Sequence, residues 1–531
     1  MLRPTHAHTA YSATIVLMAF GLLSRFMGLV RTQYIAYKFG SGIEAEAFNA
    51  AFKLPDMINY FLVGGAASIT FVTILTRYRD NGREADGERS LSVILTTMYM
   101  VLGTAIAIAE LLAPIFVHRF FYGFNAEKAA LCVQLTRIVL PAQLFFLAGG
   151  IFGSVLLVRK QFNVQAFTPL IYNLGTIVGG VLLEKRLGVA ALAWGTLAGA
   201  ICGPFLLNAI FARRAGMRYK PLLDWKDEGL REWVRLSLPL MAGVSLVTAD
   251  DWIISRFASS TDGAISLMTY AKQLFSAPIA VLAGAAGIAS MPFFAGLWSK
   301  NRRYEFATGV ADSVSRVIAL GFLAASAMAA LAVPLVDLLF TRGHFHAADA
   351  RICASYFAIF SISLFLWSAQ AIYARAFYAA GNTLLPMLAA TIVTIVSVPV
   401  YYSLYHAMGA TGLAIASDLG IALQTIVLAL LLHQRRMVSL SSLDYAELGR
   451  CLLAAASGGA AVWGLVATVS QLLTYPVALQ LHTYTHWIDF AILLTGGALW
   501  CLVARWVLEK TGSALPSVVM KRLGLTGRST V

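Results

Sequence analysis

The chain has 531 residues, of which 59% are apolar and only 12% are charged. Soluble domains are about 25% charged, so this composition excludes a cytosolic enzyme, a disordered chain and a secreted disulfide scaffold. The formal net charge of +14 would suit nucleic acid, but the basic residues are spread over short connections between apolar runs.

Apolar runs long enough to cross about 30 Å of hydrocarbon as helices recur along the chain. We therefore predict an all-α polytopic membrane protein with about 14 transmembrane helices. In chain order, the predicted spans are 12–37, 46–76, 91–117, 129–157, 164–184, 188–211, 234–256, 264–296, 312–340, 352–379, 384–406, 411–433, 449–472 and 486–508.

The connections between these spans alternate in basic content. If the N-terminus is cytoplasmic, the cytoplasmic connections and the C-terminal tail hold most of the 40 Lys and Arg residues. Such an excess marks the cytoplasmic side of membrane proteins. The pattern predicts that both termini are cytoplasmic and that the basic residues meet an anionic lipid surface, with no role for nucleic acid.

The first span contains two arginines, Arg25 and Arg31. An ionisable residue at the bilayer centre costs at least about 2.5–3.5 kcal/mol, so it is a functional hypothesis by default. Both side chains are candidates for binding an anion. The alternative is that they lie near an interface and extend their charged ends to water.

The second span begins with Glu46 and Lys53, which are seven positions apart and so share one face of a continuous helix. A salt bridge along that face is one interpretation, and a partly solvated helix entrance is the other. Pro55 follows and is expected to bend the helix.

The seventh span carries adjacent carboxylates, Asp250 and Asp251. Neighbouring residues of a helix point in different directions, so one carboxylate is expected to face a cleft and Arg256 is a candidate partner for the other. A carboxylate at this depth is a candidate for coupling to Na⁺ or to protons, although a structural ion pair near the outer surface is the alternative. Lys272 in the eighth span is a candidate cleft cation.

The chain repeats itself at a spacing near 220 residues. The pattern G-x-x-x-L-A-x-x-T-x-x-G at 188–199 recurs at 409–420 with Ser417 in place of Thr196, and Gly65 begins a segment similar to that at Gly284. Both halves begin after an even number of spans, so the repeat is parallel, about an axis along the membrane normal. We predict two six-helix lobes and two extra C-terminal helices, divided as 1–220, 221–440 and 441–531.

Motifs of catalysis are missing from the sequence. It contains no HExxH, Walker A loop, GxSxG or D-x-D motif, and its five cysteines are scattered. We expect a transporter and not an enzyme, driven by an ion gradient, the membrane potential or the substrate gradient. Asp337, Arg375 and Asp418 are lesser candidates for its polar site.

Three N-terminal stretches occur in a distinctive order: S-R-F-M-G-L-V-R at 24–31, F-G-S-G at 39–42 and A-F-N-A-A-F-K-L-P at 47–55. Together they resemble the signature of the MurJ/MviN family of lipid II flippases, within the MOP superfamily of exporters. Weaker similarity continues to about residue 440, and fourteen spans fit the family. The resemblance implies translocation of undecaprenyl-pyrophosphate-linked peptidoglycan precursor, lipid II, from the inner to the outer leaflet by alternating access.

The resemblance also implies a location, a site and partners. The location is the bacterial cytoplasmic (inner) membrane, and the partners are the lipid-linked pyrophosphate glycan and membrane lipids, bound by a monomer without a cofactor. The family's cleft is cationic, which suits a pyrophosphate. The implied substrate-binding set is Arg25, Arg31, Glu46, Lys53, Asn59 and Lys272. For ion coupling, the counterparts are Asp250, Asp251 and Asn382.

Several positions depart from the family's pattern. Thr32 and Gly64 stand where relatives commonly have acidic residues, and Asn59 stands where they have Arg. Lys272 and Gln273 replace an Asp-Arg pair. The glycan therefore stays open, and the alternatives are a flippase for another polyprenyl-linked oligosaccharide or a MATE-like drug/cation antiporter, whose cleft should be acidic and aromatic.

Overall fold

The computed structural model describes residues 10–63, 71, 74–78, 80–159, 161–473 and 485–517, and these residues form helices without strands. By compactness the chain divides into two units. Unit 1 comprises residues 1–244 and 251–266, and unit 2 comprises residues 245–250 and 267–531. The boundaries predicted at residues 220 and 440 follow the sequence repeat instead, and they stay a prediction.

Unit 1 contains the helices from α1 to α11. They are α1 (Ala10–Phe39), α2 (Ile43–Ala51), α3 (Lys53–Ile58), the π-helical segment η1 (Asn59–Val63), α5 (Glu84–Phe120), α6 (Ala126–Val139), α7 (Ala142–Val158), α8 (Phe162–Leu187), α9 (Ala190–Ala200), the π-helical segment η2 (Ile201–Leu207), α10 (Asn208–Arg214) and α11 (Glu228–Ala242). The next two helices contribute residues to both units: α12 (Leu246–Ala258) and α13 (Ala264–Ile279).

The helices of unit 2 complete the chain. They are the π-helical segment η3 (Ala280–Ala285), α14 (Ala286–Ser299), α15 (Arg303–Ala330), α16 (Ala332–Phe340), α17 (Ala347–Ile362), α18 (Leu364–Ala379), α19 (Leu384–Met408), α20 (Ala410–Gln434), the short 3₁₀ turn η4 (Leu440–Ser442), α21 (Tyr445–Leu473) and α22 (Thr485–Lys510).

The prediction of an all-α polytopic membrane protein is confirmed. Among the described residues, ten helical stretches are long and apolar enough to cross a membrane, or eleven if α17 and α18, bent by 43°, count as one span. They fall on eleven of the predicted spans. The other three predicted spans fall on α1, on α2 with α3 and η1, and on α11 with α12, which are separated by the non-helical residues 243–245.

The predicted repeat is visible in the backbone of each unit taken by itself. In unit 1, α8 ends at Gly188 with φ 55° and ψ −139°, and α9 follows. In unit 2, α19 ends at Gly409 with φ 61° and ψ −146°, and α20 follows. Glycine is the residue that adopts these backbone angles without strain. The two corners occupy equivalent positions of the sequence pattern, while the match between Gly65 and Gly284 lies partly outside the described residues.

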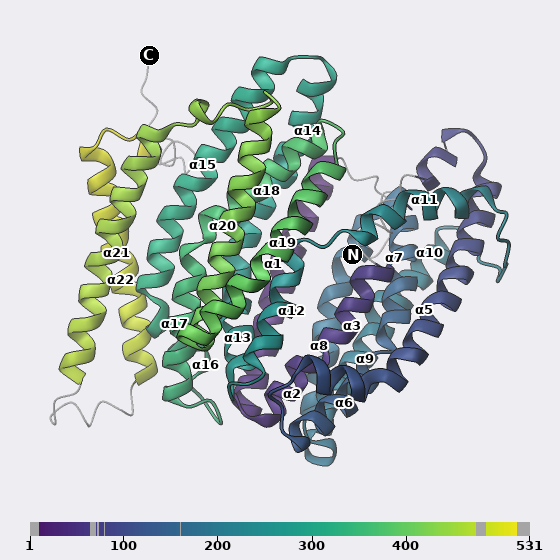
Figure 1. Cartoon of the computed structure of the whole chain (residues 1–531), viewed down its shortest axis with the longest axis horizontal. Helices are drawn as coiled ribbons and strands as arrows, with labels where there is room; N and C mark the ends of the chain where they lie inside the picture. The colour runs from purple at the N-terminus through teal and green to yellow at the C-terminus, as the bar shows by residue number, and fades with distance from the viewer. Residues whose placement is uncertain are drawn as a thin grey trace. The chain divides into compact units, whose positions relative to one another are not determined.

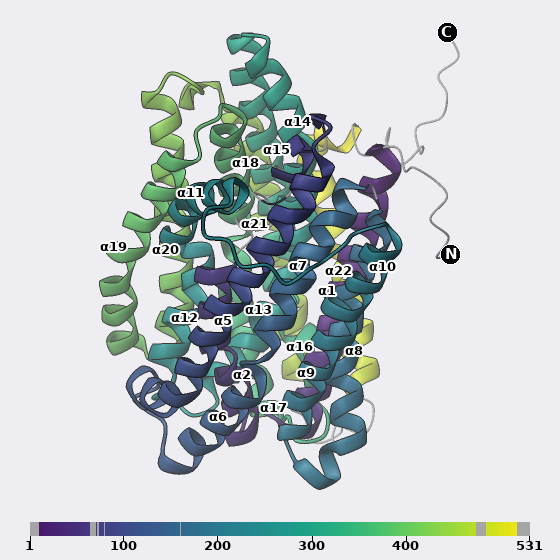
Figure 2. The same cartoon turned by 90° about the vertical axis from the view of Figure 1, so that its right-hand side faces the viewer.

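Unit 1 is held together by close contact between α8 and α9, which lie side by side (Figures 1 and 2). A Cβ atom added to Gly179 would lie 2.4 Å from the Cα atom of Gly195, and one added to Gly175 would lie 2.5 Å from the Cα atom of Gly199. Such small residues allow membrane helices to approach backbone to backbone. The remaining faces of this helix pair carry large apolar side chains.

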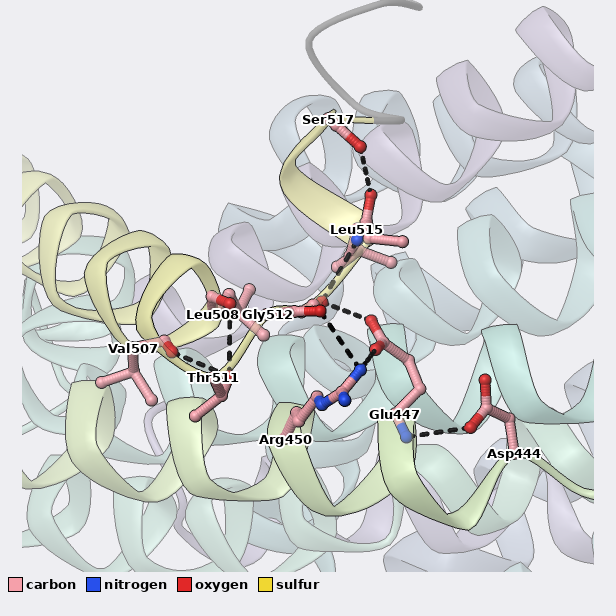
Figure 3. A network of polar contacts seen from close by, with 11 residues as sticks. Asp444, Glu447, Arg450, Val507, Leu508, Thr511, Gly512, Leu515 and Ser517 are labelled. Carbon is pink, nitrogen blue, oxygen red and sulfur yellow. Dashed lines mark hydrogen bonds and ion pairs between the residues drawn. The ribbon is translucent and has the colours of Figure 1, made fainter.

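The last two helices are attached to unit 2 in sequence order. α21 packs on α15, and α22 packs on α21 (Figure 1). Polar contacts tie the end of α22 to the beginning of α21 (Figure 3): Arg450 donates hydrogen bonds to Glu447 and to the carbonyl oxygen of Gly512, 3.2 Å away. Ser513 also donates to the Glu447 carboxylate. The C-terminal helices therefore form a fixed pair within unit 2.

Candidate functional site

A break between α2 and α3 separates the two charged residues predicted to share a helix face. α2 ends at Ala51 and α3 begins at Lys53, with Phe52 between them. Lys53 is buried and donates a hydrogen bond to the carboxylate of Asp251 within unit 1. The expected salt bridge between Glu46 and Lys53 is therefore wrong, because each residue has another partner of opposite charge.

Lys53 belongs to a group of four charged side chains in unit 1. Asp56 lies one helical turn after Lys53, and its carboxyl interacts electrostatically with Lys53, Asp251 and Arg31. Arg31 also interacts electrostatically with Tyr172 of α8. We name Arg31, Lys53, Asp56 and Asp251 the unit 1 charge cluster. Two positive and two negative groups make it formally neutral, so an added anion must compete with the two carboxylates.

The two predicted arginines of α1 differ in their surroundings. Arg25 is exposed, whereas the Nε atom of Arg31 is buried and has no hydrogen-bond partner among the described residues. Thr32, the position where relatives commonly have an acid, donates instead to the backbone oxygen of Gly28, 3.0 Å away. Arg31 therefore holds a donor that a ligand can engage.

Glu46 lies in a separate buried ion pair of unit 1. Lys128 of α6 has its Nζ atom 2.5 Å from Glu46 Oε2 and 2.8 Å from Asp262 Oδ1. The backbone N–H of Ile265 donates to the other oxygen of Glu46 at 3.1 Å. Glu46 and Lys128 are both almost completely buried. Glu46 thus ties α2 to α6 and to the start of α13, and it does not join the unit 1 charge cluster.

A second lysine–aspartate pair is buried in unit 2. Lys272 Nζ of α13 lies 2.5 Å from Asp250 Oδ2, and it also lies 5.6 Å from the centre of the Phe360 ring. Tyr401 of α19 donates a hydrogen bond to the other oxygen of Asp250. The Asp418 carboxyl of α20 interacts electrostatically with this pair. We name Asp250, Lys272, Tyr401 and Asp418 the unit 2 polar cluster.

The remaining predicted residues lie elsewhere. Asn382 accepts a hydrogen bond from the N–H of Leu385 at the start of α19. Tyr401 lies on α19, seventeen residues after its first residue Leu384 and so about 26 Å further along the helix at 1.5 Å per residue. Because Tyr401 binds Asp250, the structure does not bring Asn382 and Asp250 together. Asn59 begins η1, and Gly64 lies outside the described residues.

Arg256 does not neutralise either carboxylate of α12, contrary to expectation. Its Nη1 atom donates to the backbone oxygens of Arg119 and Phe120, at 3.0 Å and 3.4 Å. Arg256 lies five residues beyond Asp251, and a separation of five places two residues on different faces of a helix. It therefore binds the end of α5 within unit 1.

Sequence reasoning missed four residues of these clusters. Asp56 had a local signal, because it stands three positions after Lys53 and so one helical turn away. Lys128, Asp262 and Tyr401 had none, since each meets its partner across a long sequence separation. Among the described residues, no group of three or more His, Cys, Asp or Glu side chains could hold a metal ion.

Comparisons with known proteins agree on one family. The family model described as "Lipid II flippase MurJ" matches residues 35–482. A probable lipid II flippase MurJ of Haemophilus influenzae is 28% identical over 505 residues, covering 91% of this chain and 98% of that protein. The lipid II flippase MurJ of Burkholderia cenocepacia is 27% identical over 438 residues, covering 80% of this chain and 84% of that protein.

Two solved structures share the fold. A lipid II flippase MurJ in an inward closed conformation superimposes with a TM-score of 0.74 at 18% identity, covering 93% of this chain and 99% of that one. An inward-facing multidrug resistance MATE family transporter of the MOP superfamily gives a TM-score of 0.66 at 18% identity, covering 79% of this chain and 97% of that one. At these identities the similarity is one of fold.

Proposed function

This chain belongs to the MurJ family of lipid II flippases, and from that premise we propose that it moves lipid II from the inner to the outer leaflet of the membrane. The observation that carries the proposal is the match of the family model to residues 35–482 of the 531-residue chain. Membership in a family of transporters also agrees with the prediction that the chain is not an enzyme.

The charged side chains of unit 1 suit a diphosphate. Among the residues that the structure describes, the buried Nε donor of Arg31 has no partner, and leaving such a donor unsatisfied costs about 1–3 kcal/mol. Guanidinium groups bind phosphate oxygens through two parallel hydrogen bonds. Within unit 1 we assign diphosphate binding to Arg25, Arg31 and Lys53 and sugar binding to Asn59, and within unit 2 we assign Lys272, taken by itself, to an anionic group of the substrate. Glu46 acts indirectly by fixing α2 through Lys128.

The proposal includes a setting in the cell. The protein acts in the bacterial cytoplasmic membrane, as a monomer, with both termini in the cytoplasm. The basic connections between spans support this orientation, because cytoplasmic loops carry the excess of Lys and Arg. Alternating access requires that the polar headgroup cross while the polyprenyl chain stays in the bilayer.

The test is reconstitution of the full-length protein into liposomes that contain lipid II. Exposure of the headgroup on the far side is measured over time, with and without Na⁺ and pH gradients. We expect flipping by the wild type, and a rate lower by about 10- to 100-fold for Arg31→Ala, since each charged hydrogen bond lost is worth about 1.5–3 kcal/mol. Arg31→Lys should retain part of the rate.

The matched control is Arg83→Ala. Arg83 is an exposed arginine directly before α5, and its partner is Asp86 in the first turn of that helix, 2.8 Å away. Its loss should leave flipping unchanged. Wild-type protein that moves a cationic drug against a gradient and leaves lipid II in place would favour a MATE-like antiporter instead. Transport of a different polyprenyl-linked oligosaccharide in preference to lipid II would correct the assigned glycan.

A further inference from the structure

We propose that Asp250 and Asp251 are counter-ions, each of which neutralises, within its own unit, one of two lysines related by the internal repeat until an anionic ligand displaces it. Resting on the proposed function, the inference takes this ligand to be a lipid-linked diphosphate. The two carboxylates are adjacent on α12, and they are its only acidic residues. Each binds one lysine, Lys53 in unit 1 and Lys272 in unit 2.

The two lysines occupy equivalent positions in the two halves of the sequence. Lys272 stands 219 positions after Lys53, which is the spacing that also relates Gly284 to Gly65. Each lysine precedes a π-helical segment, η1 after Lys53 and η3 after Lys272. π-Helical turns are rare and are frequently found at functional sites. The match in both sequence and backbone shows that the lysines are a repeated feature of the fold.

The repeat does not extend to the counter-ions. The residue that stands 219 positions before Asp250 is Arg31, and the one that stands 219 positions before Asp251 is Thr32. The helix α1 therefore has no carboxylate at the two positions equivalent to Asp250 and Asp251. Both acids for the two lysines come from α12. Successive residues of a helix diverge by about 100° around its axis, which explains how neighbouring carboxylates of one helix bind two different lysines.

The two pairs are exposed in opposite ways. In unit 1 the lysine side chain is 5% exposed and the aspartate 40%, whereas in unit 2 the lysine is 21% exposed and the aspartate 5%. Asp251 can therefore turn into solvent and leave Lys53 to a ligand. Asp250 is held by Tyr401 as well as by Lys272, so it yields less readily. Asp250 should therefore compete with an anionic ligand for its lysine more strongly than Asp251 does, and its removal should have the larger effect on binding.

Internal counter-ions would allow the carrier to return after it has released an anion. An uncompensated lysine in a low-dielectric interior costs several kcal/mol, so a carrier that has released an anion needs another negative charge before it returns. Asp250 and Asp251 supply that charge internally. It follows that removing either carboxylate should strengthen the binding of an anion and slow repeated turnover, with less effect on a single passage.

The experiment measures binding of inorganic pyrophosphate to the full-length protein in detergent, by calorimetry. For Asp250→Asn and Asp251→Asn we expect a Kd lower by about tenfold, the equivalent of about 1.4 kcal/mol of lost competition, with the larger change for Asp250→Asn. The control is Asp86→Asn, which removes a carboxylate from an exposed ion pair with Arg83 and should leave the Kd unchanged. Unchanged or weaker binding in both α12 variants would overturn the proposal.

Flipping assays with the same variants separate this inference from the proposed function. In liposomes with lipid II, each variant should complete a first passage near the wild-type rate and then turn over more slowly. If the wild type does not move lipid II while pyrophosphate binding tightens as expected, the counter-ion role stands and the substrate assignment fails. If the wild type moves lipid II and neither variant tightens binding, the counter-ion role fails alone. Should one variant not fold, the other lysine–aspartate pair provides the same test.

Discussion

Lys53 and Lys272 are equivalent by sequence, yet their surroundings differ in kind. Lys53 lies among charges, because Asp251 is its partner and the Asp56 carboxyl interacts electrostatically with Lys53, Asp251 and Arg31. Lys272 lies among aromatic rings, with Phe360 near its ammonium group and with Tyr401 bound to its partner Asp250.

The difference teaches that a sequence repeat preserves the backbone more faithfully than the chemistry. Both halves keep the glycine corner at Gly188 and Gly409 and a π-helical segment after the lysine. The side chains around that shared frame have diverged. Unit 1 contains Arg31, whose buried Nε donor has no partner in the described part of the chain, so we assign unit 1 the main role in anion binding. Unit 2 holds its carboxylate, Asp250, more tightly, because Tyr401 binds it as well as Lys272.

The largest effect on stability is expected from the buried pair of Glu46 and Lys128, which the second half of the chain lacks. The positions that correspond to them are Ile265 and Asp349. Lys128→Met should lower the free energy of unfolding by about 3–5 kcal/mol, because it leaves the buried Glu46 carboxylate without its cation. The measurement is thermal unfolding of the purified protein in detergent.

The paired variant decides whether charge is the cause. Glu46→Gln combined with Lys128→Met removes both charges and should recover most of the lost stability, since a neutral buried pair avoids the cost of desolvation. Equal losses in the single and double variants would show that packing, and not charge, makes this contact important.

Much of this architecture was predictable, because its causes are local. Runs of apolar residues of membrane-crossing length indicated the spans, and the glycine pattern indicated the repeat, whose first residues Gly188 and Gly409 adopt the same backbone angles. The partners of Asp250 and Asp251 were not predictable. Arg256 is near them in sequence, but the choice of a lysine depends on which helices pack together, which no local pattern encodes.

The helix pairs α8–α9 and α19–α20, which meet at Gly188 and Gly409, differ in how closely they pack. Gly195 of α9 corresponds to Ala416 of α20. A Cβ atom at Gly195 would lie 2.6 Å from the carbonyl oxygen of Gly175 and 2.9 Å from the Cα atom of Gly179. Gly195→Ala should therefore destabilise the protein by about 1–3 kcal/mol through overpacking, as measured by the same thermal unfolding.

Ala416→Gly is the matched change in unit 2. Its effect should be no more than about 1 kcal/mol, the usual loss for a glycine within a helix, because the α19–α20 pair already accommodates a Cβ atom at this position. Equal destabilisation by the two changes would mean that both corners pack alike, and the contrast drawn between the units would be limited to their charged groups.

The smallest effect concerns Asp262, which resembles Asp251 in binding a buried lysine but lies in the turn after α12 with its side chain fully exposed. The hydrogen bond from Lys128 lowers the pKa of the Asp262 carboxyl. A carboxyl whose pKa is lowered by folding stabilises the protein above its unfolded pKa of about 3.9, and this contribution is lost as the pH falls through the folded value. Asp262→Asn should therefore lower the stability only slightly at neutral pH, since exposed charges are screened, and not at all below the folded pKa. Unfolding curves of the wild type and of Asp262→Asn, measured at pH 7 and at successively lower pH, should converge. A difference in stability that stays constant with pH would assign the effect to the shape of the turn. A difference that increases as the pH falls would contradict the direction of the pKa shift.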